Sequence, residues 1–324
     1  QQVKRVWKKP VPAEWMCQAH PPTVWRAILE GKPYPVKALI VTSNNPLVAY
    51  ANTNLVYKAL TCDNLELLVV MDFWMTPTAA LADYVLPAAN WLERPVFSSL
   101  FGLSSWFIMS ERPVKPLYER LTDYEFWRNL GLRLGQKEYW PWQSLEEAYC
   151  ERLKPLGVSS YEEFVRNVRW DFPEPQYRKY IRTGFATPSG KAEIYSSVLE
   201  ALGYDPLPSY AEPAESPIST PELAATFPFI LVAGGSFMPY HHSEGRQIPT
   251  QRAMSPEPLC DIHPDAAQRL KISDGDWVYI ETPRGRCKQK ARLTVGTHPK
   301  VVHAQHDWWF PEKEGSEPIL HGAW

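Results

Sequence analysis

The sequence predicts an α/β segment followed by a small all-β barrel, and two observations predict this order. First, two short apolar runs, residues 36–42 and 65–71, flank a helical stretch at about 49–59, which is the pattern of a parallel βαβ unit. Second, after Phe227 the hydrophobic period changes to two, and short strands recur with turn residues between them. We therefore expect two kinds of architecture in one chain of 324 residues.

The βαβ unit has a polar turn at the carboxyl end of each of its strands. The first turn is at residues 43–46, and the second runs from Asp72 to Thr78. Ligands of open α/β sheets bind at such strand ends, so we expect a binding site there. The other elements expected in this segment are a helix at 22–31 and a short strand at 84–87.

The rest of the chain first becomes helical and irregular and then returns to strands. Helices are expected at 124–134, 145–153 and 160–168, and a stretch at 205–221 that is rich in Pro, Ser and Glu predicts a surface linker. The last third predicts strands at 229–233, 277–282, 288–295 and 301–306, with a helix at 261–270. We accordingly expect an α/β domain at 1–140, a helical and Pro-rich connection at 141–220, and a β-barrel domain at 221–324.

The composition excludes several classes of protein. The 36 acidic and 34 basic residues nearly cancel, so the chain lacks the basic character of a nucleic-acid-binding protein. No run of about 18 apolar residues occurs, which argues against a membrane span. The five cysteines form no C-x-x-C motif, and neither a dinucleotide G-x-G-x-x-G nor a P-loop is present. The first residues include no initiator Met and no apolar signal core, so we expect an internal or mature piece of a longer protein.

Two loops could approach an anionic ligand closely. Residues 43–46 (Ser-Asn-Asn-Pro) offer side-chain amides and backbone N–H groups just before a helix. Residues 234–236 (Gly-Gly-Ser) follow a strand, where glycines permit close approach of the backbone. Each motif alone is also common as an ordinary turn.

A denser group of hydrogen-bond donors follows at residues 240–246 (Tyr-His-His-Ser-Glu-Gly-Arg), with Arg252 just beyond it. Adjacent histidines on a strand point to opposite faces, which favours hydrogen bonding over metal ligation, although a loop relaxes that rule. Together with two arginines they suit a phosphate or a heteroaromatic ring. A solvated polar loop is the alternative.

Acidic and aromatic residues provide the remaining candidates. Asp72 and Asp123 could each be a helix N-cap, which is the commoner use, or a carboxylate that accepts the N–H groups of a purine. Residues 303–309, which include His306 and Trp308, crowd the end of the last strand. They could form a buried aromatic plug or a wall over a flat cofactor.

In their order along the chain these motifs resemble the dimethyl sulfoxide reductase family, whose members carry molybdenum or tungsten on two pyranopterin guanine dinucleotides. The resemblance rests on KALIVTSNNP (37–46), VVMD (69–72), MTPTA (75–79), ADYVLPA (82–88), PSGKAE (188–193), LKISDGDWV (270–278), TPRG (282–285) and WWFPE (308–312). It covers about residues 20 to 312. It implies a Rossmann-like α/β domain and a β-barrel of the double-psi type.

The resemblance also implies roles for the matching positions. The turn at 43–46 would hold a guanosine, with Ser43 where glycine is usual, and Asp123 would accept the guanine N–H groups. His306 and Trp308 would close over the second pterin. The expected cofactor-binding residues are Ser43, Asn44, Asn45, Pro46, Asp72, Thr76, Asp123, Gly234, Gly235, Ser236, Tyr240, His241, His242, Ser243, Arg246, Arg252, His306 and Trp308.

The implied activity is two-electron or oxygen-atom transfer to or from a small molecule at a molybdenum or tungsten centre, as in the clade of thiosulfate and polysulfide reductases and acetylene hydratase. A tungsten-dependent non-redox hydratase and a non-catalytic cofactor-binding or assembly subunit are the alternatives. We expect the metal ligand and a [4Fe–4S] cluster outside this chain, and no protein-ligated metal within it. The implied partners are the remainder of the catalytic subunit and an iron–sulfur electron-transfer subunit, in a soluble assembly of the prokaryotic cytoplasm or periplasm.

Overall fold

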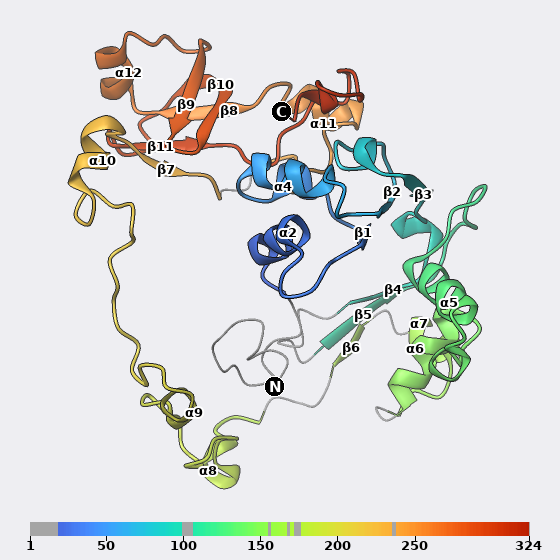
Figure 1. Cartoon of the computed structure of the whole chain (residues 1–324). Coiled ribbons are helices and arrows are strands. Elements are labelled where there is room, and N and C mark those ends of the chain that lie inside the picture. The colour runs from blue at the N-terminus through green and yellow to red at the C-terminus, as the bar shows by residue number, and fades with distance from the viewer. Residues whose placement is uncertain are drawn as a thin grey trace. The chain divides into compact units, whose positions relative to one another are not determined.

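The computed structural model describes residues 19–98, 106–154, 157–166, 169–171, 176–234 and 238–323. The chain forms two compact units that are interleaved along the sequence (Figure 1). Unit 1 comprises residues 1–69, 75–83 and 198–324, and unit 2 comprises residues 70–74 and 84–197. Unit 1 therefore contains both the first helices and the last third of the chain.

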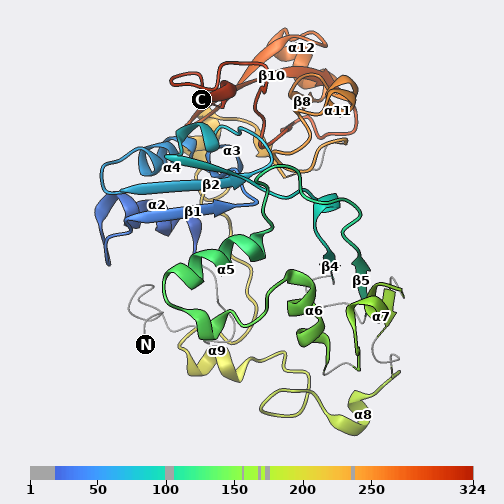
Figure 2. The same ribbon diagram turned by 90° about the vertical axis from the view of Figure 1, so that its right-hand side faces the viewer.

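The α/β segment has the predicted parallel sheet. Strands β1 (Ala38–Thr42), β2 (Leu67–Asp72) and β3 (Tyr84–Pro87) lie in the order β1-β2-β3. Helix α2 (Pro21–Glu30) packs on α4 (Thr53–Leu60), and the short α3 (Pro46–Ala49) precedes α4 (Figure 2). The core of this segment is formed by buried apolar side chains of β1, β2 and the helices, among them Ile28, Val41, Val56, Leu68 and Val70, whereas Tyr84 and Val85 of β3 are exposed.

The helix expected at 49–59 is α4, which begins four residues later than expected, and the short α3 ends at Ala49 before it. Asn52 separates them: its backbone is left-handed, with φ 64°, and its side-chain oxygen accepts a hydrogen bond from the backbone N–H of Leu55. Asparagine tolerates this conformation and is a strong N-cap, so α4 starts there.

The last third forms a curled five-stranded sheet in the order β7-β11-β8-β10-β9. Its strands are β7 (Ile230–Val232), β8 (Leu259–Ile262), β9 (Trp277–Thr282), β10 (Gly285–Leu293) and β11 (Val301–Ala304). Strands β8 and β10 are parallel, as are β7 and β11, whereas β11 with β8 and β9 with β10 are antiparallel. Helix α12 (Pro264–Leu270) covers one face, where Cys260 and Ile262 pack with Ala266 and Ala291. A second helix here, α11 (Pro249–Met254), was not expected.

Unit 2 contains helices α5 (Asp123–Arg133), α6 (Leu145–Leu153) and α7 (Tyr161–Arg166), close to the predicted bounds. It also contains an antiparallel sheet that the sequence analysis did not predict, β4 (Val96–Ser98), β5 (Trp106–Ser110) and β6 (Arg169–Asp171). Its core includes Met109, Leu153 and Phe164. The short helices α8 (Tyr180–Thr183), α9 (Ser197–Ala201) and α10 (Pro221–Thr226) lie further along the chain, and the stretch expected as a linker holds only turns between α9 and α10. None of the helices in the described part of the chain has the length and apolarity needed to cross a lipid bilayer.

Candidate functional site

The turn after β1 holds a buried amide. Ser43 has a left-handed backbone, with φ 53°, a conformation that favours glycine. Asn45 is 3% exposed, and its side-chain oxygen accepts hydrogen bonds from the backbone N–H of Thr78 at 3.2 Å and from its hydroxyl at 2.6 Å. The Asn45 side-chain nitrogen is buried and has no partner among the described residues. Asn44 donates to the Tyr50 hydroxyl at 3.1 Å. The turn therefore fixes one buried N–H donor that is still available to a ligand.

The second strand end is a tight polar turn. Asp72 accepts a hydrogen bond from the backbone N–H of Trp74 at 3.2 Å, and no helix begins at this residue. Thr76 is buried, and its hydroxyl accepts from the backbone N–H of Ala79 at 3.2 Å. The N-cap alternative for Asp72 is therefore wrong.

Asp123 is the first residue of α5 and is not its cap. Thr122 is the cap: its hydroxyl accepts from the Glu125 N–H, and the Glu125 carboxylate accepts in return from the Thr122 N–H. The Asp123 carboxylate lies 3.9 Å from Arg94, and its side chain is 41% exposed. Capping does not use this carboxylate, so beside its ion pair with Arg94 it can accept a ligand's N–H groups.

The donor-rich segment at 240–246 packs against the segment after β11. We call this group the arginine–histidine cluster, and it consists of Tyr240, His242, Arg246, Arg252, His306, Asp307 and Trp308. Arg246 is 4% exposed, and its guanidinium carbon lies 4.6 Å from the Tyr240 ring centre and 4.7 Å from that of Trp308. Its Nη2 donates to the His306 carbonyl at 3.1 Å, and its Nη1 donates to the His242 carbonyl. A buried cation thus ties together two segments about 60 residues apart.

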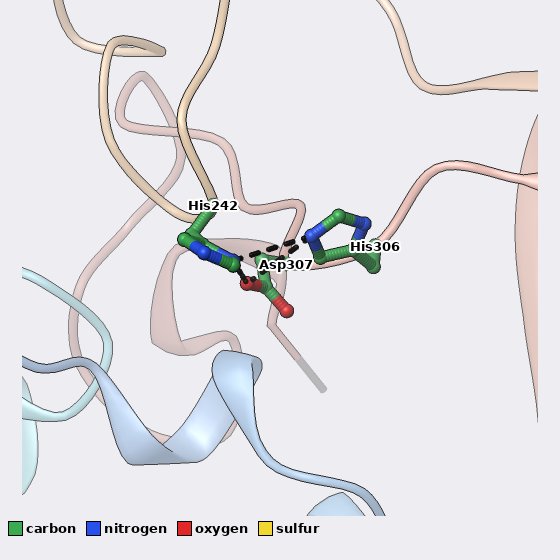
Figure 3. A group of neighbouring side chains, drawn as sticks. All are labelled: His242, His306 and Asp307. Atoms are coloured by element: carbon green, nitrogen blue, oxygen red, sulfur yellow. Dashed lines mark hydrogen bonds and ion pairs between the residues drawn. The ribbon is translucent and has the colours of Figure 1, made fainter. Parts of the chain in front are cut away.

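Three side chains of the cluster meet at one point (Figure 3). Asp307 Oδ2 lies 3.3 Å from His242 Nδ1 and 3.7 Å from His306 Nε2, and these two nitrogens are 3.4 Å apart. His242 and Asp307 both have left-handed backbones, with φ 49° and 56°. Such strain at non-glycine residues is common at functional sites.

The electrostatics of the cluster favour an anionic ligand. Burial lowers the pKa of Arg246 to about 10, so the guanidinium stays charged at neutral pH. Burial raises the pKa of Asp307, against the opposing effects of His306, His242 and Arg246. The buried polar atoms here that have no hydrogen-bond partner among the described residues are Arg246 Nε, Arg252 Nη1, His306 Nδ1, Trp308 Nε1, Gln247 Oε1 and Gln251 Oε1. Such atoms are costly to leave unpaired, and three of the six, Arg246 Nε, Arg252 Nη1 and Trp308 Nε1, are donors.

The other predicted residues of this segment lie around the cluster. His241 is exposed, and its ring centre lies 4.6 Å from that of His242. The Ser243 carbonyl accepts from Trp309 Nε1 at 2.8 Å. Arg252 donates to Glu312 at 2.8 Å. Gly234 follows β7, whereas Gly235 and Ser236 lie outside the described residues.

The predicted set did not include Asp307. The only signal in the sequence is an acid between a histidine and a tryptophan just after the last strand. Its contact with His242 depends on packing between distant segments, which one sequence does not reveal.

A second polar group lies on the sheet of unit 1. Asp261 on β8 is paired in register with Arg292 on β10 and His303 on β11, and we call these three residues the Asp261 row. Arg292 donates twice to the Asp261 carboxylate, at 2.6 and 2.9 Å, and His303 Nδ1 lies 3.4 Å from it. The row borders a hollow of about 640 Å³.

Two family models match the chain. Residues 22–133 match the model described as Molybdopterin oxidoreductase, and residues 229–319 match the molybdopterin dinucleotide binding domain. The first covers the turns after β1 and β2 together with Asp123, and the second covers the arginine–histidine cluster.

Individual proteins agree with these models. The chain is 39% identical to acetylene hydratase of Syntrophotalea acetylenica, over 92% of this chain and 40% of the relative. It is 29% identical to dopamine dehydroxylase of Eggerthella lenta, over 92% of this chain and 36% of the relative. It is 28% identical to the molybdopterin-containing subunit of thiosulfate reductase of Salmonella typhimurium, over 85% of this chain and 38% of the relative.

A solved structure agrees as well. The structure of acetylene hydratase from Pelobacter acetylenicus superposes with a TM-score of 0.88 at 39% identity, and it covers 94% of this chain and 42% of that one. The chain thus spans about two fifths of the length of the relatives it matches. It belongs to the dimethyl sulfoxide reductase family of molybdopterin oxidoreductases.

Proposed function

We propose that this chain is the cofactor-binding part of an enzyme that transfers two electrons or an oxygen atom to or from a small molecule at a molybdenum or tungsten centre. The observation that carries the proposal is the arginine–histidine cluster, where a buried guanidinium is surrounded by unpaired donors. The matching dinucleotide binding domain supports a molybdopterin dinucleotide as the ligand.

The residues present fit such a cofactor. A pyranopterin guanine dinucleotide carries a pyrophosphate and flat heterocycles, and these need charged donors, aromatic surfaces and amide contacts. Arg246 Nε, Arg252 Nη1 and Trp308 Nε1 would donate to the pyrophosphate and pterin. The other predicted residues of the two segments, Gly234 to Ser236, His241 and Ser243 among them, would lie beside it.

A guanosine would be held by the α/β turns. The unpaired side-chain nitrogen of Asn45 supplies a fixed donor, and Ser43, Asn44 and Pro46 shape the turn around it. Asp72 and Thr76 would lie against the same nucleotide, and the exposed carboxylate of Asp123 would accept the guanine N–H groups.

The chain's own contribution is binding, orientation and exclusion of water. The Tyr240 and Trp308 rings lie against the Arg246 guanidinium, which is buried, and this keeps water from the charge and strengthens its attraction for an anion. When bound, the cofactor supplies the metal and the dithiolene sulfurs that carry the electrons. The metal ligand and a [4Fe–4S] cluster would come from the remainder of the catalytic subunit, and an iron–sulfur subunit would exchange the electrons.

The similarity to acetylene hydratase favours a second candidate, a non-redox hydratase that adds water to a substrate. An assay with and without an artificial electron donor separates the two candidates. A hydratase converts substrate without net electron flow, whereas a reductase stops when the donor is omitted.

The direct test is to purify the intact assembly that contains this chain and release its bound groups with acid. We expect molybdenum or tungsten by metal analysis and GMP by chromatography, in a fixed ratio to the chain. An assembly with neither metal nor guanine nucleotide would refute the proposal. A non-catalytic assembly subunit is the reading favoured if Asp123→Ala and Arg246→Gln leave the cofactor content unchanged.

A further inference from the structure

We propose that His242, His306 and Asp307 form a binding site for a borderline divalent cation such as Zn²⁺, held by protein side chains alone. This ion differs from the molybdenum or tungsten of the proposed cofactor, which dithiolene sulfurs carry. The inference rests on the geometry of the three side chains. Because the proposed cofactor would bind in the same cluster, the ion is expected in the chain before the cofactor is bound.

The three ligand atoms already have the spacing that a small cation needs. Zinc bonds of about 2.0 to 2.2 Å at tetrahedral angles place neighbouring ligand atoms about 3.3 to 3.6 Å apart. The edges of the His242, His306 and Asp307 triangle are 3.3, 3.4 and 3.7 Å. An ion could therefore sit above this triangle with side-chain shifts of only a few tenths of an ångström.

The donor set selects the kind of ion. Two imidazole nitrogens and one carboxylate oxygen suit Zn²⁺, Co²⁺ and related ions, whereas Mg²⁺ and Ca²⁺ prefer oxygen ligands. Three protein ligands leave at least one coordination position for water or another ligand, as in open zinc sites.

The backbone fixes two of the three ligands in place. His242 and Asp307 have left-handed backbones, and Arg246 holds the carbonyls of His242 and His306. The objection raised by the sequence concerned two adjacent histidines, and it does not apply here because His242 pairs with His306 rather than with its neighbour His241. The adjacent His306 and Asp307 do share the ion, and they lie in a loop after β11 where Asp307 has a left-handed backbone, so the alternation of a strand does not separate their side chains.

The charges set the strength of the site. A divalent cation would neutralise the buried carboxylate of Asp307, which is 6% exposed, but the nearby charge of Arg246 would oppose it. We therefore expect weaker binding than at a structural zinc site with four ligands.

The test is to titrate the metal-free, cofactor-free full chain with Co²⁺ and follow its visible absorption. We expect one ion per chain, the intense bands of tetrahedral Co²⁺, displacement by Zn²⁺ and none by Mg²⁺. The absence of a thiolate charge-transfer band would exclude the cysteines. X-ray absorption of the wild-type zinc complex should show imidazole and oxygen ligands without sulfur.

Variants assign the ligands. His242→Ala, His306→Ala and Asp307→Asn should each weaken Co²⁺ binding by about tenfold or more. His241→Ala, which removes the adjacent exposed histidine, and His298→Ala, far along the sequence, are the matched controls and should bind as wild type. No saturable binding to the wild-type chain, sulfur ligands in the zinc complex, or an equal loss in His241→Ala would overturn the proposal. The wild-type spectra decide even if a variant fails to fold.

Discussion

Two buried aspartates of unit 1 lie close to an arginine and a histidine, and they differ in what the arginine does. In the Asp261 row, Arg292 donates two hydrogen bonds to the carboxylate, and this ion pair raises the pKa of Arg292. In the arginine–histidine cluster, Arg246 donates to the backbone carbonyls of His242, Glu244 and His306, and burial lowers its pKa to about 10. The row is paired within the protein, whereas the cluster keeps buried donors unpaired.

This difference separates stability from binding. A buried charge with a well-placed partner holds neighbouring strands in register, and removing the partner is destabilising. A buried charge with unused donors costs free energy in the folded state, and a ligand can offset that cost. The same three residue types thus pair with one another in the Asp261 row, whereas in the arginine–histidine cluster they leave donors for the proposed ligand.

The largest expected effect is on cofactor content. Arg246→Gln should lower the guanine nucleotide released from the assembly by about tenfold or more, because a buried charged donor to an anion is lost. Arg292→Gln is the matched control and should leave the nucleotide content unchanged. Chromatography of the acid-released nucleotide measures both. Equal losses of nucleotide in the two variants would show that Arg246 holds the cofactor no more than Arg292 does.

The next effect is on stability. Asp261→Ala should lower the free energy of unfolding by about 2 kcal/mol, since Arg292 and His303 lose their shared partner while Arg292 is already half exposed. Asp307→Asn should cost less than half as much, because the buried carboxylate is only loosely paired. Urea unfolding of the cofactor-free chain, followed by tryptophan fluorescence, gives both values. A larger loss of unfolding free energy in Asp307→Asn than in Asp261→Ala would contradict the view that Asp261 stabilises the fold more than Asp307 does.

Two glycines compare the packing beside the arginine–histidine cluster with the packing beside β10. Gly245 and Gly275 both have positive φ, at 95° and 84°, so alanine strains either backbone by about 1 kcal/mol. An added Cβ at Gly245 would also lie 3.0 Å from the Tyr240 ring and press on Gln251, whereas at Gly275 it would meet only Lys290 at 3.8 Å. We expect Gly245→Ala to cost about 1 kcal/mol more in thermal unfolding than Gly275→Ala. Equal losses of stability in the two variants would mean that Tyr240 and Gln251 move aside for the added methyl group at little cost.

The smallest effect concerns a third buried acid, Glu93 of unit 2, whose side chain is 4% exposed. Burial alone would raise its pKa, but hydrogen bonds from the N–H groups of Asn90 and Leu117 and from Arg120 outweigh it and lower the pKa. Because folding lowers the pKa of Glu93, the ionised carboxylate stabilises the folded protein at pH values above 4.5, the pKa of a glutamate in the unfolded chain. This stabilisation is lost as the pH falls through the lower pKa of the folded state. Between pH 6 and pH 3 the wild type should lose about 1 kcal/mol more than Glu93→Gln. If the unfolding free energies of the wild type and Glu93→Gln fell equally with pH, the hydrogen bonds would not lower the pKa of Glu93.

The sequence predicted the elements whose signals are local. The apolar runs of β1 and β2 and the alternation of β9 place those strands within two residues of their observed bounds. Strand β8 (Leu259–Ile262) was missed because it is four residues long and includes Asp261, which alternation marks as exposed but which is buried beside Arg292. The sheet β4-β5-β6 was missed because two of its strands have three residues each, too few to show a period.

The candidate site was predictable in its segments but not in its contacts. The residues around Tyr240 and those around Trp308 stood out as donors and aromatics, and the structure brings them together. The family resemblance assigned them a ligand, which composition alone did not. The position of Asp307 against His242, and the internal hydrogen bonds of Asn45, depend on packing between distant segments. No local pattern encodes such contacts.

The interleaving of the two units has a consequence for biosynthesis. Unit 1 needs residues 198–324 as well as the first helices, so it cannot be completed until the end of this chain has been made. Residues 84–197, by contrast, leave the ribosome earlier and can begin to pack among themselves. During that interval unit 1 is incomplete, and an incompletely folded nascent chain is prone to aggregation and depends on chaperones.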